Sequence, residues 1–186
     1  LTQAKKDGRV TYIPVVANCV VDVFYDLGKS DQTALLLMQR VGREYRFIDY
    51  YQNRLEDVEH YVKFLKSRDY LYGEHYLPHD ADHDRLGMHR NIREQFEDAG
   101  ITPTRIVPRC QSKENAIAQA RAILPECWFH KGDDERGKRM EVGLDALSNY
   151  RYKYNDDNDV YAKVPHHDWS SNGADAFMQF AQDFLS

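Results

Sequence analysis

The sequence lacks a long apolar run and has few cysteines, and both absences restrict the class of protein. No stretch of about 18 consecutive apolar residues occurs in the 186 residues, and the first residues lack the basic, apolar and small segments of a signal peptide. We therefore expect a cytosolic protein with no membrane partner. Cys19, Cys110 and Cys127 are far apart and form no C-x-x-C pair, which argues against a disulfide framework or a cysteine zinc site.

Positive charge is also scarce, because 25 Lys and Arg residues face 30 Asp and Glu residues, a net charge of −5. Proteins that coat nucleic acid derive their affinity from basic side chains, so this composition does not indicate one. An excess of carboxylates suits a cation site better. Contact with DNA would require local basic stretches or bound metal to offset the acidity.

With 42% hydrophobic residues, the chain is long enough for one domain with one core. It begins with Leu1 rather than Met, and its first residues are polar and basic. We interpret residues 1–14 as a linker and residues 15–186 as a single domain of a longer polypeptide.

The order of the expected elements predicts an α/β fold. Three strands in a meander are followed by alternating helices and strands, which gives a mixed sheet covered by helices. A hairpin is expected near residues 150–164, around a polar turn. The expected strands cover 19–26, 33–41, 43–51, 70–77 and 101–109, and the expected helices cover 54–67, 85–98, 112–124, 140–150 and 173–185.

The segment Gly28-Lys29-Ser30 raises the possibility of a phosphate-binding loop. That motif requires an earlier glycine where this chain has Val23, and a helix afterwards. Residues 33–41 instead look like a buried strand. The sequence therefore favours a tight turn between strands, in which Gly28 supplies permissive backbone angles.

Two aspartates lie at or just after the ends of expected strands. Asp26 lies at the end of the first strand and Asp80 just past the end of another. Ligands in α/β sheets usually bind at strand ends, so both carboxylates could project into one crevice. An aspartate at the end of a strand more often stabilises a turn through its side chain than takes part in catalysis.

Four segments in order resemble the nuclease domain of tailed-phage terminase large subunits, which has a ribonuclease H-like fold. The resemblance covers residues 15–186. The matching segments are Asp26-Leu27-Gly28 with Asp31 and Thr33; Leu77-Pro78-His79-Asp80-Ala81; Lys113-Glu114-Asn115-Ala116-Ile117 with Ala120-Arg121; and His167-Asp168-Trp169-Ser170-Ser171 with Gly173-Ala174-Asp175-Ala176-Phe177. The chain departs from the family pattern at Asn172, where the family commonly has His.

This resemblance implies an endonuclease that cuts concatemeric double-stranded DNA during viral genome packaging, using two Mg²⁺ or Mn²⁺ ions. Asp26, Asp80 and Asp175 would form the catalytic, metal-binding triad. The family's partners would be an N-terminal packaging ATPase in the same chain, the portal protein and the small terminase subunit, with action on the procapsid in the host cytoplasm. The resemblance also implies that Asp31 and Asp168 are accessory metal ligands and that His167 contacts a metal ligand without binding the metal itself. The residues that it implies as DNA contacts are Lys113, Arg121, Arg136, Lys138 and Arg139.

Electrostatics gives an independent reason to expect a cation among converging carboxylates. Two carboxylates about 4 Å apart repel by roughly 4 kcal/mol at an effective dielectric of 20. A divalent metal removes that repulsion, and oxygen ligands favour Mg²⁺ or Mn²⁺ over Zn²⁺.

Other interpretations remain open from the residues alone. Asn172 and Asp175 could form a helix N-cap pair. His75, His79 and His83 could suggest zinc on one helical face, although Pro78 interrupts such a helix. The domain could also be a docking module that binds DNA or the portal without cutting.

Overall fold

The computed structural model describes residues 1–28, 32–83, 89–149, 152–155, 160–165 and 171–184. Seven strands form a mixed sheet in the order β1-β7-β4-β3-β2-β5-β6, and two further strands form a hairpin. The α/β class and the added hairpin are confirmed. The strands of the large sheet are β1 (Val10–Thr11), β2 (Val21–Asp26), β3 (Gln32–Val41), β4 (Glu44–Arg54), β5 (Tyr72–Pro78), β6 (Thr104–Val107) and β7 (Cys127–His130), and those of the hairpin are β8 (Tyr152–Asn155) and β9 (Val160–Pro165).

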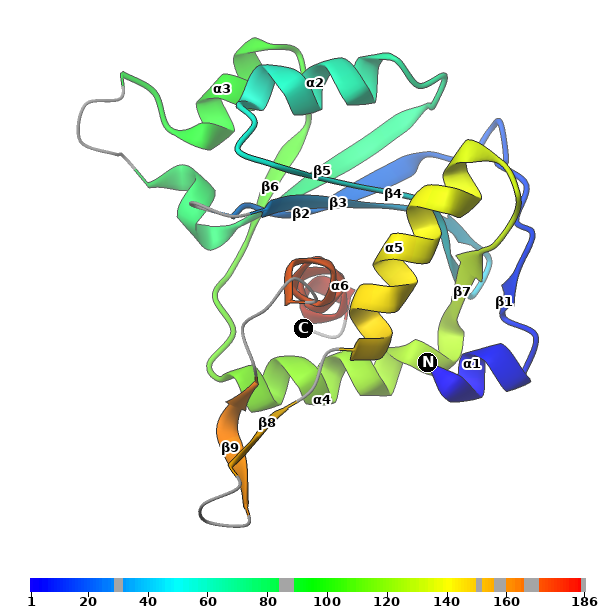
Figure 1. The fold of residues 1–186 in the computed structure, drawn as a ribbon. Helices are drawn as coiled ribbons and strands as arrows, with labels where there is room; N and C mark the ends of the chain where they lie inside the picture. Colours follow the sequence, from blue (N-terminus) through cyan, green and yellow to red (C-terminus); the bar gives the residue numbers. More distant parts are fainter. Residues whose placement is uncertain (29–31, 84–88, 150–151, 156–159, 166–170, 185–186) are drawn as a thin grey trace.

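Helices cover both faces of the large sheet (Figure 1). One face carries α2 and α3, and the other carries α5 and α6, with α4 packed against α6. The helices are α1 (Thr2–Lys6), α2 (Val58–Lys66), α3 (Ile92–Asp98), α4 (Lys113–Ile123), α5 (Glu135–Asn149) and α6 (Ser171–Phe184), with short 3-10 turns η1 (His79–Asp82) and η2 (Leu124–Glu126).

Strand β2 lies in the middle of the sheet and determines which side chains reach which core. It pairs antiparallel with β3 and parallel with β5. Successive side chains of a strand point to opposite faces. Val23 and Tyr25 therefore enter the core under α2 and α3, whereas Phe24 enters the core under α6. The same alternation places Asp26 on the α6 face.

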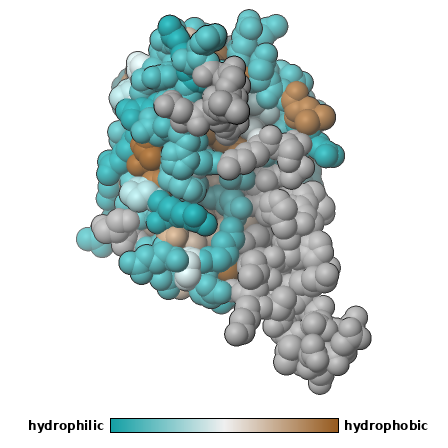
Figure 2. All heavy atoms as spheres, turned by 90° about the vertical axis from the view of Figure 1, so that its left-hand side faces the viewer, coloured by the Kyte–Doolittle hydropathy of each residue, from teal (hydrophilic) through white to brown (hydrophobic). Residues whose placement is uncertain are grey.

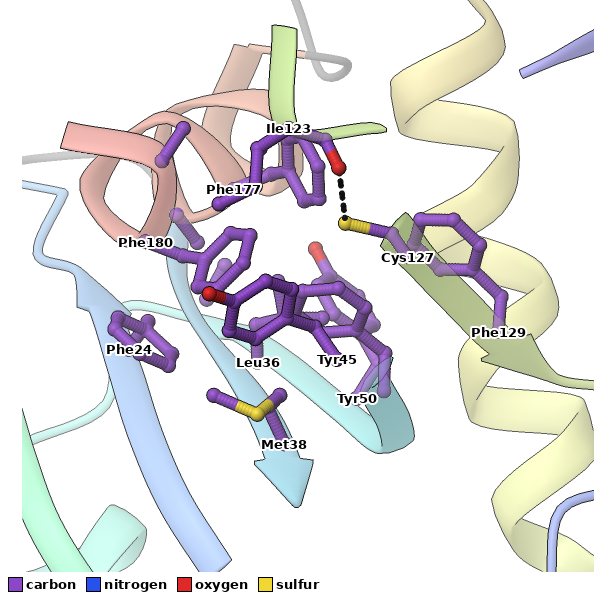
Figure 3. Close-up of a cluster of buried hydrophobic side chains, with 14 of the residues drawn as sticks. Phe24, Leu36, Met38, Tyr45, Tyr50, Ile123, Cys127, Phe129, Phe177 and Phe180 are labelled. Atoms are coloured by element: carbon purple, nitrogen blue, oxygen red, sulfur yellow. Dashed lines mark hydrogen bonds between the residues drawn. The ribbon is translucent and has the colours of Figure 1, made fainter. Parts of the chain in front are cut away.

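The core under α6 is built largely from aromatic rings (Figure 3). Phe180 makes edge contacts with Phe24, Tyr45 and Phe47, at ring-centroid distances of 5.3, 5.0 and 5.0 Å. Such arrangements add to the free energy gained by burying the rings. This packing fixes α6 against β2 and β3, in the centre of the sheet.

Some boundaries differ from the predictions for local physical reasons. Helix α5 begins at Glu135 rather than 140, because Asp134 Oδ1 accepts a hydrogen bond of 2.8 Å from the Gly137 amide and starts the helix inside the charged stretch. Helix α2 begins at Val58, after the N-cap Asp57. Residues 1–14, interpreted as a linker, contain α1 and β1, and β1 pairs with β7.

The connection after β2 also decides the phosphate-loop alternative. Gly28 is followed by strand β3 and not by a helix, so the phosphate-loop interpretation is wrong. A Cβ on Gly28 would come within 2.3 Å of the Gln32 carbonyl oxygen. Glycine is required there because the chain folds back tightly on itself.

Candidate active site

The first acidic residue, Asp26, is the last residue of β2. Its cross-strand partner is Ala34 of β3, and Ala34 is in turn opposite Gln52 of β4. Asp26 thus lies at the rim of the apolar core and faces α6.

Asp80 reaches the same edge of the sheet because β5 runs parallel to β2. Strand β5 ends at Pro78, and Asp80 follows within η1. Figure 1 shows the end of β2, η1 and the start of α4 on the same, left-hand side of the molecule. The expectation that strand ends bring these two aspartates together is confirmed.

Asp175 approaches from the opposite direction, on α6. Helix positions 175, 178, 179 and 182 share one face, and Asp175, Met178, Gln179 and Gln182 line one cavity. Ala174, Phe177 and Ala181 are buried on the other side. Because α6 begins at Ser171, Asn172 lies inside the helix and is not its N-cap, so the capping interpretation is wrong.

The three aspartates line a single open cavity of about 670 Å³. Its walls come from the ends of β2 and β5, from the segment before α4, and from α6. The remaining lining residues are Leu27, Pro78, His79, Pro108, Arg109, Cys110, Gln111, Ser112, Lys113, Ala116, Met178, Gln179 and Gln182.

The surroundings of Asp26 strongly disfavour its charged form. Burial raises the pKa of its carboxyl well above the usual range, and the negative charges of Asp175 and Asp80 raise it further. The positive charge of Lys113 opposes this shift. A carboxylate in such surroundings gains from a cation nearby.

Lys113, predicted as a DNA contact, lies within the acidic cavity itself. It is the first residue of α4, whose N-cap Ser112 accepts a hydrogen bond of 3.2 Å from the Asn115 amide, as predicted. The Lys113 ammonium forms an ion pair with Asp175 Oδ1. The sequence places these residues 62 positions apart and contains no signal of this pairing.

Tyr50 is a supporting residue that the sequence analysis missed. Its hydroxyl donates a hydrogen bond of 2.6 Å to Gln52 Oε1, and burial, together with the charge of Asp26, raises its pKa. A Cβ on Gly143 would come within 2.9 Å of the Tyr50 ring, and one on Gly173 within 2.9 Å of its hydroxyl. The two glycines let α5 and α6 close over Tyr50, next to Asp26.

The other candidate DNA contacts lie away from the cavity lining. Arg139 pairs with the fully buried Asp49, at 2.8 Å between Nη2 and Oδ2. Arg136 donates to the Ile13 carbonyl oxygen and pairs with Asp134. Lys138 pairs with Glu135 on the surface, and Arg121 lies in the last turn of α4. Among these four, Arg139 has a clear structural task.

Asp31, His167 and Asp168 lie outside the described residues. The zinc alternative concerns residues that are described. His75 is buried and its Nδ1 lies 2.8 Å from the Tyr25 hydroxyl, whereas the His79 and His83 rings lie near η1, 5.9 Å apart. The three histidines do not converge, so the zinc interpretation is wrong.

The donor set fits a hard divalent cation, since Asp26, Asp80 and Asp175 offer carboxylate oxygens around one cavity. Burial, and then the charges of Asp175 and Asp80, raise the pKa of Asp26, and such an ion would favour its ionised form. Among the described residues, no three His, Cys, Asp or Glu side chains already converge closely enough to hold a metal. Binding would therefore require the carboxylates to draw together.

The surface on this side of the molecule suits a polar ligand. Figure 2 views the left-hand side of Figure 1, and the coloured residues on it are mostly hydrophilic, with apolar residues in small separate areas. Of the helices that the structure describes, none combines the length and the apolar character needed to cross a membrane.

Among solved structures, large terminases of bacteriophages share the fold of this chain. The large terminase of a thermophilic bacteriophage aligns with a TM-score of 0.69 and 11% identity, over 96% of this chain and 43% of that one. The P22 large terminase nuclease domain aligns with a TM-score of 0.65 and 14% identity, over 96% and 89%. The nuclease domain of the large terminase g2p from bacteriophage SPP1, with bound Mn, aligns with a TM-score of 0.62 and 12% identity, over 93% and 95%.

No protein-family model matches the sequence, and neither does any curated protein. The likeness therefore lies in the three-dimensional structure. The chain spans 43% of the large terminase from the thermophilic phage and nearly all of the isolated P22 and SPP1 nuclease domains. It has the ribonuclease H-like α/β fold of the large terminase nuclease domains.

Proposed function

We propose that the chain is the metal-dependent endonuclease domain of a tailed-phage packaging motor, which cuts concatemeric double-stranded DNA when packaging begins and ends. The observation that carries the proposal is the meeting of Asp26, Asp80 and Asp175 at one open cavity, from three separate elements of a nuclease fold. Neighbours of the same fold were solved with bound magnesium and manganese, which supports Mg²⁺ or Mn²⁺ as the cofactor. We propose that two such ions bind.

The side chains of the cavity divide into acidic and basic groups with different tasks. Asp26, Asp80 and Asp175 would hold the metal through their carboxylate oxygens. Bound ions of this kind supply Lewis acidity, which activates a water and stabilises the leaving oxygen in phosphodiester hydrolysis. Arg109 and Lys113 line the same cavity and would orient the DNA by contacting its phosphate oxygens.

The proposed setting follows from the same likeness. The domain would be joined to an N-terminal packaging ATPase in the same chain, and would act with the portal protein and the small terminase subunit on the procapsid in the host cytoplasm. The 43% share of the thermophilic-phage large terminase that it spans is consistent with such a longer chain.

The test is plasmid cleavage with Mg²⁺ or Mn²⁺, comparing wild type with Asp26→Asn and Asp80→Asn. Loss of a metal ligand should reduce cutting by about 100-fold or more. Asp69→Asn is a matched control, because Asp69 is exposed between α2 and β5. Equal cutting by Asp26→Asn, Asp80→Asn and wild type would exclude the proposal.

A non-catalytic docking module for DNA or the portal is the second candidate. It is favoured by the absence, among the described side chains, of three donors already close enough for a metal. Salt-sensitive DNA binding or portal binding, with no cleavage at any Mg²⁺ or Mn²⁺ concentration, would support this role instead.

A further inference from the structure

The ion pair between Lys113 and Asp175 occupies the place where the proposed function needs a metal. Both residues line the acidic cavity, and their side chains are 37% and 24% exposed. They come from α4 and α6, which pack against each other. The ammonium therefore approaches the carboxylate from the cavity wall and remains accessible to solvent ions.

Lys113 acts on more than its direct partner. Its positive charge also favours the ionised form of Asp26, against the combined effect of burial and of the neighbouring carboxylates. One ammonium thus offsets part of the negative charge of two of the three aspartates in the metal-free protein.

We propose that Lys113 is the resident counter-ion of the metal-free site, and that a divalent cation must displace its ammonium from Asp175 in order to bind. This inference rests on the proposed metal-dependent function. The ammonium and the metal repel each other and compete for the same carboxylate oxygen. Lys113 therefore stabilises the metal-free site and weakens metal binding.

The position of Lys113 suits an exchange of this kind. Its backbone is fixed at the start of α4 by the Ser112 cap. The four-carbon stem of lysine is flexible and carries a compact charge, so the ammonium can move while the helix stays in place. After displacement it remains at the wall of the cavity that Arg109 also lines, where a DNA phosphate oxygen is a suitable acceptor.

The experiment measures Mn²⁺ binding by the electron paramagnetic resonance signal of free Mn²⁺, and thermal unfolding in EDTA and in Mn²⁺. Lys113→Met and Lys113→Gln remove the charge, and Lys113→Arg keeps it. Lys66→Met is the matched control, because Lys66 is exposed on α2, across the sheet from α6.

We expect Lys113→Met and Lys113→Gln to bind Mn²⁺ about tenfold more tightly than wild type and to unfold at a lower temperature in EDTA. Saturating Mn²⁺ should reverse the loss of stability, because a ligand stabilises the state that binds it. Lys113→Arg and Lys66→Met should bind Mn²⁺ like wild type.

Two results would overturn the inference, and they differ in meaning. If Asp26→Asn weakens Mn²⁺ binding but the two charge-removing variants bind no more tightly than wild type, the metal site stands and the counter-ion role is wrong. If Asp26→Asn binds Mn²⁺ as wild type does, the metal site itself is wrong, and the inference falls with it.

Discussion

Arg139 of α5 holds the fully buried carboxylate of Asp49 through two hydrogen bonds, from Nε to Oδ1 at 2.9 Å and from Nη2 to Oδ2 at 2.8 Å. The Tyr70 hydroxyl and the Tyr50 amide also donate to this carboxylate. The interaction ties α5 to β4. Asp49 is next in the chain to Tyr50, the residue that supports Asp26 in the candidate active site.

Breaking this pair from one side should be strongly destabilising. Arg139→Met leaves Asp49 charged and buried, and we expect the free energy of unfolding to fall by about 3–5 kcal/mol. Urea denaturation would measure this loss. Adding Asp49→Asn to the variant should recover part of it, whereas a loss well below about 1 kcal/mol in the single variant would contradict the structural role of Arg139.

The metal-free protein should become less stable as pH rises, on account of Asp26. Its folded-state pKa is raised by burial and then by Asp175 and Asp80, so the folded state holds a proton that the unfolded state has already lost. Stability therefore falls as pH rises from the ordinary carboxyl range, about 4, towards the folded pKa. In EDTA, Asp26→Asn should show a flatter stability profile than wild type between about pH 4 and 8, and should be more stable at the upper end. An unchanged profile would mean that Asp26 does not carry this penalty.

The Ser112 cap should matter for both stability and cutting. Ser112→Ala removes the acceptor for the Asn115 amide at the start of α4 and should cost about 1 kcal/mol. Asp57→Ala is the matched control, because Asp57 Oδ1 accepts from the His60 amide at 3.0 Å and caps α2 on the other face. Plasmid cleavage should fall only in Ser112→Ala, since only that cap holds a wall of the cavity; an equal effect in both variants would contradict this prediction.

Gly173 should tolerate no side chain. In Gly173→Ala the new Cβ would meet Ala146 Cβ and the Tyr50 hydroxyl, each at 2.9 Å. We expect the displacement of α6 to cost about 1–3 kcal/mol of stability, measured by urea denaturation. Tyr50→Phe removes one of the two clashes, so the double variant should lose less than the sum of the single variants. Simple additivity would argue against contact between these residues.

The sequence was sufficient to predict five of the seven strands of the large sheet, β2 to β6, and the edge where the acids meet. Buried runs such as residues 33–41 mark central strands, and the carboxyl ends of parallel strands lie together, so Asp26 and Asp80 could be paired from their places alone. Asp175 was identified by resemblance, because a single aspartate on an amphipathic helix has no local feature that distinguishes it.

What could not be predicted depends on contacts between distant segments. The pairing of Lys113 with Asp175 requires the packing of α4 on α6, and the fit of Gly143 and Gly173 around Tyr50 requires the docking of two helices. The start of α5 could not be predicted because its first residues are charged, and Asp49, the partner of Arg139, lies on another element.

Helix α6 follows every other described element along the chain, and it alone carries Asp175 and the rings of Phe177 and Phe180. During synthesis, the ribosome therefore exposes the residues of β2 and β5 before it delivers the helix that covers them. Until α6 docks, Asp26 and Asp80 lack their third acidic neighbour and the aromatic core stays open to water. Any chemistry that depends on all three carboxylates therefore has to wait until translation has passed α6.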